Sequence, residues 1–120
     1  MKKYQLILIS LLIVFAISCV QKAYKKTVVI TLTVQNMKNI KTVGIRGNGK
    51  PLSWDADFEM TPVVKDSLYT ATATTLTGYK FAEVKFTVNG EFELKEQPNR
   101  RLVFSDKDTT YYHAVFNLAQ

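Results

Sequence analysis

Hydrophobic and polar residues alternate along most of the chain after residue 26, a pattern typical of β-strands with one buried face. In residues 27–35, Val28, Ile30, Leu32 and Val34 share one face, and β-branched residues dominate the segment. The same alternation predicts further strands at residues 42–46, 58–63, 68–76, 81–88, 91–94, 101–104 and 109–117. No stretch after residue 26 has a helical period. Seven or eight strands, spaced by roughly 8 to 12 residues, predict an all-β antiparallel sandwich or barrel with one core.

Residues 84–100 contain the clearest local signal, a β-hairpin. Asn89-Gly90 predicts a tight turn, because both residues tolerate the positive φ angle that such a turn requires. In the second strand, alternation places Phe92 with Leu94 on one side, opposite the charged residues Glu91, Glu93 and Lys95. Pro98 ends the strand, since proline cannot extend a ladder. The hairpin therefore brings a basic, an aromatic and an amide side chain together: Lys85, Phe92 and Asn99.

Residues 1–18 have the features of a secretory signal peptide. Lys2 and Lys3 precede a run of 12 residues at positions 6–17 that is apolar except for Ser10. Such a run is too short for a bilayer core, which takes roughly 20 residues. Residues 16–19 (AISC) resemble a bacterial lipobox, which implies cleavage before Cys19 and lipid attachment to it. An ordinary signal peptide cut nearby and an uncleaved anchor are the alternatives.

This interpretation divides the chain into three parts: a signal peptide at 1–18, a lipidated tether at 19–26 and a β-domain at 27–120. It predicts a protein of the bacterial cell envelope that is attached to a membrane, on the periplasmic side or at the surface. Because Cys19 is the single cysteine, no internal disulfide can form.

The net charge of +6 is concentrated before the predicted domain. Without residues 1–18 it falls to +4, and without Lys22, Lys25 and Lys26 it falls to +1. An almost neutral domain lacks the basic face that nucleic-acid binding requires, so we expect no nucleic-acid partner. The three lysines either attract anionic lipid head groups or form a soluble linker.

Few residues suggest catalysis. His113 is the only histidine and lies inside the last predicted strand, while Asp55 and Asp57 are two carboxylates in a loop. The glycine-rich residues 44–49 are not followed by the helix that a phosphate-binding loop needs. No pair of histidines or cysteines suggests zinc. We therefore predict a protein that is not an enzyme and that uses no cofactor or metal.

Trp54, the only tryptophan, suggests binding instead. It is predicted to lie in a loop beside Ser53 and Asp55, where its ring can stack on the apolar face of a sugar while polar neighbours bind hydroxyl groups. The alternative is that Trp54 closes one end of a sandwich.

Several short motifs occur in an order that resembles a starch-binding domain. They are residues 43–48 (VGIRGN), 52–55 (LSWD), Met60, Tyr69, 78–86 (GYKFAEVKF), 91–93 (EFE) and 98–100 (PNR). Their order and spacing are similar to carbohydrate-binding module family 20, and more loosely to the glycogen-binding family 48, over about residues 27–116. The resemblance implies an antiparallel, immunoglobulin-like β-sandwich that binds α-1,4-glucans such as starch, glycogen or maltooligosaccharides.

The resemblance also implies the carbohydrate-binding residues. Trp54 matches the first stacking aromatic, and Lys85 matches a lysine that bonds sugar hydroxyls. Phe92 stands where the family usually has a second stacking tryptophan, and Glu93 follows it. Asn99 matches an asparagine that contacts sugar. Phe92 offers a smaller platform than tryptophan, and the stretch between Phe92 and Asn99 is about two residues longer than is usual in the family.

The leading hypothesis is thus a non-catalytic glucan-binding module, attached to a membrane through Cys19. Its rival is a structural or protein-interaction module that keeps the sandwich without a working sugar site and binds an envelope protein by an exposed strand edge.

Overall fold

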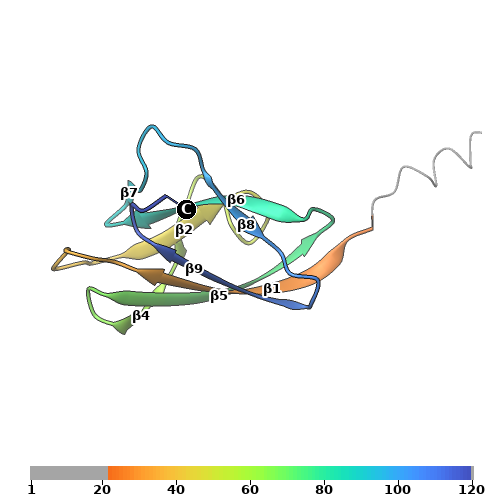
Figure 1. Cartoon of the computed structure of the whole chain (residues 1–120), viewed down its shortest axis with the longest axis horizontal. Helices are drawn as coiled ribbons and strands as arrows, with labels where there is room; N and C mark the ends of the chain where they lie inside the picture. Colours follow the sequence, from red (N-terminus) through yellow and green to blue (C-terminus); the bar gives the residue numbers. More distant parts are fainter. Residues whose placement is uncertain (1–21, 120) are drawn as a thin grey trace, which may run out of the picture.

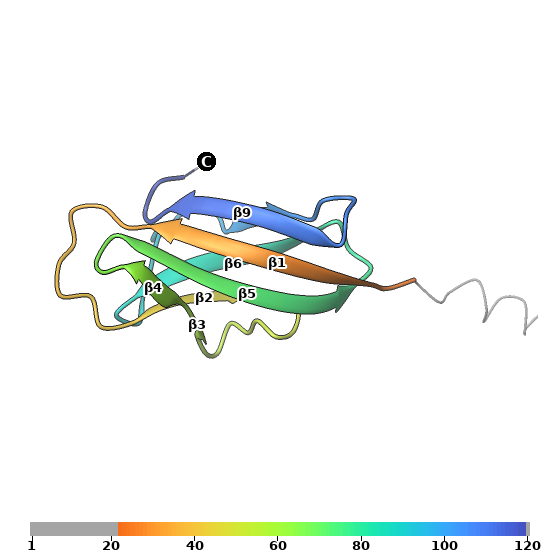
Figure 2. The ribbon, with the colours of Figure 1, turned by 90° about the horizontal axis from the view of Figure 1, so that it is seen from below.

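The computed structural model describes residues 22–119, which form nine strands in two stacked β-sheets (Figures 1 and 2). Sheet A contains, in spatial order, β4 (Thr61–Val64), β5 (Leu68–Thr77), β1 (Tyr24–Thr33) and β9 (Thr109–Val115). Sheet B contains β3 (Phe58–Glu59), β2 (Val43–Gly47), β6 (Phe81–Val88) and β7 (Glu91–Phe92), with β8 (Arg100–Val103) paired to β6. The prediction of an all-β fold is confirmed.

The core lies between the two sheets. From sheet A, Ile30 and Leu32 of β1 are buried, and from sheet B so are Ile45 of β2 and Phe86 of β6. Burying each such side chain contributes about 1.5–3 kcal/mol. The predicted inward face of the first strand is confirmed, since every second residue from Val28 is buried.

Two features of the strands differ from the prediction. The predicted strand at 58–63 is divided into β3 and β4, because Met60 is 3% exposed between the sheets and the chain passes there from sheet B to sheet A. The number of strands is therefore nine rather than seven or eight. In addition, β1 and β9 pair in parallel, whereas the other pairs are antiparallel as expected.

The start of β1 is earlier than predicted. The strand begins at Tyr24, where the sequence suggested a tether up to residue 26, and Tyr24, Lys25 and Lys26 pair with the end of β5. The Nζ atom of Lys26 donates to the carbonyl oxygens of Ser105 (3.0 Å) and Lys107 (3.1 Å). Two of the three tether lysines thus belong to the sheet.

The predicted hairpin is confirmed. Asn89 and Gly90 have φ angles of 53° and 79°, and they join Val88 directly to its partner Glu91. The side chain of Asn89 also accepts hydrogen bonds from the backbone N–H of Lys41 (2.7 Å) and of Thr42 (3.2 Å). This turn therefore ties the hairpin to the segment before β2 and sets the register of β7.

Among residues 22–119, no helix has the length and apolar character needed to cross a membrane. The predicted signal peptide and Cys19 lie outside the described residues.

Candidate functional site

The outward face of sheet B gathers most of the residues that the sequence analysis selected. Antiparallel pairing places Arg46 of β2 opposite Lys85 of β6, and Thr87 of β6 opposite Phe92 of β7. Arg100 pairs with Val84, and both residues are buried, while Asn99, which immediately precedes β8, is exposed. We call this surface, made by Arg46, Trp54, Lys85, Phe92 and Asn99, the sheet B face.

Arg46 lies at the centre of this face and connects its parts. Its Nε atom donates to Oδ1 of Asp57 at 2.7 Å, and its Nη1 atom donates to the carbonyl oxygen of Trp54 at 3.1 Å. Its guanidinium carbon lies 4.9 Å from the centre of the Phe92 ring, which is within cation–π range. One guanidinium group therefore holds the Trp54 loop on one side and the Phe92 ring on the other.

The loop that carries Trp54 lies directly on β2. A Cβ atom at Gly44 would be 2.6 Å from Cβ of Asp57, so only glycine permits this close approach. Oδ1 of Asp57 also accepts a hydrogen bond from the hydroxyl of Thr87 at 2.9 Å. Asp57 thus links the loop to β2 and to β6, and it neutralises part of the positive charge on the face.

Trp54 is partly exposed, with 36% of its surface accessible. It lies in the loop between β2 and β3, as predicted, and Ser53 stiffens that loop by accepting a hydrogen bond from the backbone N–H of Asp55 at 3.0 Å. The ring is therefore attached to a braced loop and accessible to a ligand, which is what stacking requires.

Lys85 has a structural role on this face. Its Nζ atom donates to the carbonyl oxygens of Leu94 (3.1 Å) and Gln97 (3.0 Å), and so it holds the turn between β7 and β8. An ammonium group has three N–H donors, so within the described part of the chain one remains for a ligand hydroxyl. Asn99, which immediately precedes β8, is exposed.

Glu93 does not belong to this face, and here the sequence-based assignment needs correction. Its side chain is fully buried, at 0% exposed. Oε2 accepts from the backbone N–H of Phe86 (3.0 Å) and from Nε of Arg100 (2.7 Å). Oε1 accepts from Nη2 of Arg100 (2.8 Å) and from the backbone N–H of Asn117 (3.1 Å). All of these partners are internal, so Glu93 cannot contact a sugar at the surface.

The orientation of Phe92 also differs from the alternation read in the sequence. Phe92 pairs with Thr87 on the outward face and stacks on Arg46, whereas Leu94 is 4% exposed. The strand ends between them, and Leu94, which adopts a positive φ of 48°, is buried. Phe92 is half-buried under Arg46. It is therefore a less accessible platform than Trp54.

Arg100 connects the segment after β7 with the end of β9 beneath the sheet B face. Besides the bidentate bond to Glu93, its Nη2 atom donates to the carbonyl oxygens of Val115 and Leu118, each at 2.8 Å. The hydrogen bond with Glu93 raises the pKa of Arg100 above its ordinary value. Burial raises the pKa of the neighbouring Tyr112, against the opposing effect of the Arg100 charge.

Arg46, the residue that organises the face, was not among the site residues predicted from the sequence. Its place between the inward-facing Ile45 and Gly47 indicated an outward side chain, but its partners lie 8, 11 and 46 residues further along the chain. His113 lies on sheet A, where its Nε2 atom is 2.9 Å from the hydroxyl of Thr33. Within residues 22–119, no three His, Cys, Asp or Glu side chains are arranged as metal ligands.

No known protein-family model matches the chain, and no curated protein matches its sequence significantly.

Proposed function

We propose that this chain is a non-catalytic module that binds α-1,4-glucans on the sheet B face, within an immunoglobulin-like sandwich held at a membrane through Cys19. The observation that carries the proposal is the register of sheet B. It places Lys85 and Phe92 on one outward surface, Arg46 attaches the Trp54 loop to the same surface, and the exposed Asn99 immediately precedes β8, which pairs with β6. The five residues of the sheet B face are far apart in the sequence. All of them except Arg46 are residues that the resemblance to a starch-binding domain assigns to sugar binding.

The chemistry of the face suits a sugar chain. Trp54 supplies a flat apolar surface for the C–H face of a glucose ring, and Phe92 supplies a smaller second one. The remaining N–H of Lys85 and the amide of Asn99 bond hydroxyl groups. Such a shallow, solvent-exposed site should leave a net binding free energy of about 4–6 kcal/mol, which corresponds to a Kd of about 1 mM to some tens of micromolar.

Titration with maltoheptaose tests the proposal, with the fluorescence of Trp54 and the heat of binding as readouts. A chain that begins at Val20 is suitable, because both sheets and the core are formed by residues 24–115. We expect saturable binding in the stated range and its loss in Trp54→Ala. The absence of any response up to several millimolar in the unmodified protein would overturn the proposal.

Tyr111→Ala is the matched control. Tyr111 is an aromatic residue with 81% of its surface accessible, but it lies on sheet A, away from the sheet B face. Its removal should leave the affinity for maltoheptaose unchanged. Equal losses in Trp54→Ala and Tyr111→Ala would indicate weak, nonspecific contact between sugar and exposed aromatic rings, and would contradict the site.

The attachment to a membrane rests on residues 16–19 and is tested separately. Cells grown with an alkyne-labelled fatty acid should incorporate the label into the full chain and not into its Cys19→Ser variant. Label in both proteins, or in neither, would refute lipidation at Cys19, while the glucan titration would remain a valid test of the sheet B face.

One observation favours a protein-interaction module instead. Arg46 covers one side of the Phe92 ring, so one face of the second aromatic platform is already occupied. Capture of an envelope protein that excess maltoheptaose does not release, together with no sugar response, would support this alternative.

A further inference from the structure

A cavity of about 390 Å³ opens at the end of the domain where β1 begins. It lies between the two sheets: sheet A supplies Val28, Ala73 and Thr75, and the other side is lined by Ala82 and Leu102 of sheet B. The volume is in the range of about 300–1,000 Å³ that is usual for small-molecule pockets. This cavity is separate from the sheet B face, because it lies on the inward side of the sheets.

Small side chains create the cavity. The inward positions near the end of β5 hold Ala73, Thr75 and Thr77, and the facing position of β6 holds Ala82. Further into the domain the inward positions hold large residues such as Phe86 and Leu32, both 0% exposed. The two sheets therefore close tightly at one end of the core and leave space at the other. The floor is closed, since the lining residues Ile30 and Leu102 are 1% and 2% exposed.

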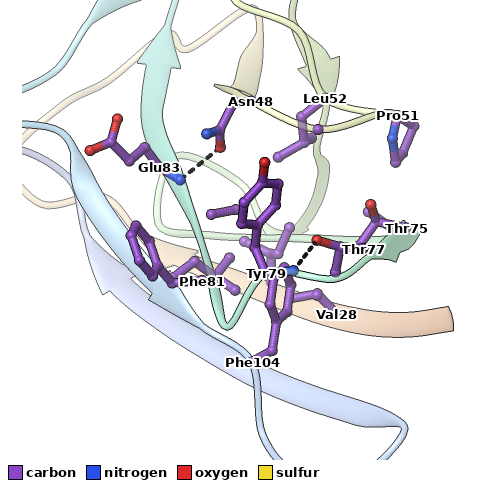
Figure 3. Close-up of a pocket in the computed structure, with 15 residues that line it drawn as sticks. Val28, Asn48, Pro51, Leu52, Thr75, Thr77, Tyr79, Phe81, Glu83 and Phe104 are labelled. Atoms are coloured by element: carbon purple, nitrogen blue, oxygen red, sulfur yellow. Dashed lines mark hydrogen bonds between the residues drawn. The ribbon is translucent and has the colours of Figure 1, made fainter. Parts of the chain in front are cut away.

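The mouth is aromatic and open. Figure 3 shows Tyr79 in the middle of the lining residues, with Phe81 and Phe104 on one side and Pro51 and Leu52 on the other. Tyr79 is 74% exposed, and its backbone N–H donates to the hydroxyl of Thr77 at 3.0 Å. The few polar groups of the lining include Asn48, whose side-chain oxygen accepts from the backbone N–H of Glu83 at 2.8 Å.

Positive charge is concentrated at the same end of the domain. This end consists of residues 22–26, 48–52, 78–83 and 101–108, which contain seven basic and three acidic residues. The rest of the described chain contains seven of each and is balanced. Two of the basic residues stand next to lining residues: Lys50 follows Gly49, and Lys80 follows Tyr79. This end of the domain is therefore net positive, while the charged residue that itself lines the cavity is the acidic Glu83.

We propose that this cavity binds one long acyl chain that has a negatively charged head, with the chain between the sheets and the head near Lys50 and Lys80. An apolar, closed-ended space suits a hydrocarbon chain and rejects a sugar, whose hydroxyls would be left without hydrogen bonds inside it. The net positive charge of this end of the domain supplies the complementary charge for a carboxylate or phosphate. Because the first described residue, Lys22, is at this end, a membrane-attached chain would present the mouth to lipid.

Dodecanoate is the probe that tests this site. We expect saturable shifts in the backbone amide resonances of Ala73, Thr75 and Ala82 when it is added to the isotope-labelled chain that begins at Val20. Ala73→Leu fills the cavity and should lower the affinity at least roughly tenfold. Ala82→Leu serves the same purpose if Ala73→Leu does not fold. Thr72→Leu is the matched control, since Thr72 is exposed on the other side of the same strand and should bind as the unmodified protein does.

The charge of the mouth is tested by a second set of variants. Lys50→Ala and Lys80→Ala should each lower the affinity for dodecanoate by roughly fivefold and leave the affinity for uncharged dodecanol unchanged. Lys38→Ala and Lys65→Ala, at the opposite end, should change neither. Binding of dodecanoate by Ala73→Leu and Ala82→Leu as tightly as by the unmodified chain would overturn the proposal, and so would shifts confined to residues outside the cavity.

A comparison of two forms of the protein distinguishes the possible sources of the bound acyl chain. If the chain that begins at Val20 binds dodecanoate and the full protein extracted from membranes does not, the lipid on the protein itself fills the cavity. If both bind it, the ligand is a free or membrane lipid. Failure of both to bind would refute the acyl site, while maltoheptaose titration of the same samples would report on the sheet B face independently.

Discussion

Replacing Glu93 by alanine tests the most consequential correction to the sequence-based site. The Glu93 carboxylate accepts four internal hydrogen bonds, two from Arg100 and one each from the backbone N–H groups of Phe86 and Asn117. The alanine variant leaves the Arg100 guanidinium buried without its counter-charge and two backbone donors without acceptors. Truncation of a residue that only contacts sugar at the surface would have none of these effects, so the free energy of unfolding is the quantity to measure.

The expected loss is large for a domain of this size. Removing one partner of a buried ion pair costs about 3–5 kcal/mol, and each buried donor without a partner adds to that cost. A domain of this length has a free energy of unfolding of about 5–15 kcal/mol. We therefore expect Glu93→Ala to lose a fifth or more of the total stability. Arg100→Met in the Glu93→Ala background should recover part of the loss, because it removes the unpaired charge.

Urea unfolding followed by Trp54 fluorescence and circular dichroism provides the measurement. At an m-value of about 2 kcal/mol/M, the midpoint should fall by roughly 1.5–2.5 M. Glu96→Ala, at an exposed position in the turn after β7, is the matched control and should change the free energy of unfolding by no more than about 0.5 kcal/mol. If Glu93→Ala were as mild as Glu96→Ala, the buried pair would not stabilise the domain and the correction would be wrong.

Three further perturbations follow from single contacts. Lys85→Met keeps an aliphatic side chain but loses the N–H donors, both those to the turn before β8 and the one proposed to bond a sugar hydroxyl. Loss of a hydrogen bond worth about 1 kcal/mol should lower the affinity for maltoheptaose roughly fivefold. An unchanged affinity would remove Lys85 from the site. Gly44→Ala forces Asp57 away, because the new Cβ would lie 2.6 Å from that residue, and should cost about 1–3 kcal/mol in thermal unfolding, a prediction that an unaltered melting temperature would refute. Burial raises the pKa of Tyr112 above its ordinary value of 10.0, so its contribution to stability is complete below pH 10 and is lost as the pH rises further. Tyr112→Phe should therefore flatten the fall of stability above pH 10, measured by urea unfolding at several pH values, and an equal slope in both proteins would contradict this.

Local patterns predicted much of the fold. The strand at 81–88 has the predicted bounds, and Asn89-Gly90 forms the turn because both residues adopt the positive φ angles expected of them. The parallel pairing of β1 with β9 was not predictable in this way. The pairing joins two strands that are more than 80 residues apart in the sequence. Alternation within one strand carries no information about which strand lies next to it or in which direction that neighbour runs.

The orientation of residues 91–94 was misjudged for a specific physical reason. Alternation grouped Phe92 with Leu94 and left Glu93 outside, following the rule that apolar residues face the core. The two-residue turn, however, places Glu93 next to the inward-facing Phe86. A carboxylate is tolerated there because Arg100 neutralises it, and that partner is recognisable only when the register of the hairpin and the return of β8 are considered together.

The buried pair explains why the surface residues of this site stand where they do. Side chains of a strand alternate between its two faces, so a residue fixed inside positions its neighbour outside. Glu93 fixes the backbone next to Phe92, and Arg100 fixes the backbone next to Asn99, and their bidentate bond joins the two segments across the turn that Lys85 also holds. In the proposed site, Glu93 would therefore affect a ligand only through the positions of Phe92 and Asn99. The same logic applies to Arg46, whose backbone is set by Ile45 in the core and whose guanidinium in turn holds Trp54. The sheet B face is therefore organised from the interior outward, and the residues proposed to bind sugar depend on buried partners for their positions.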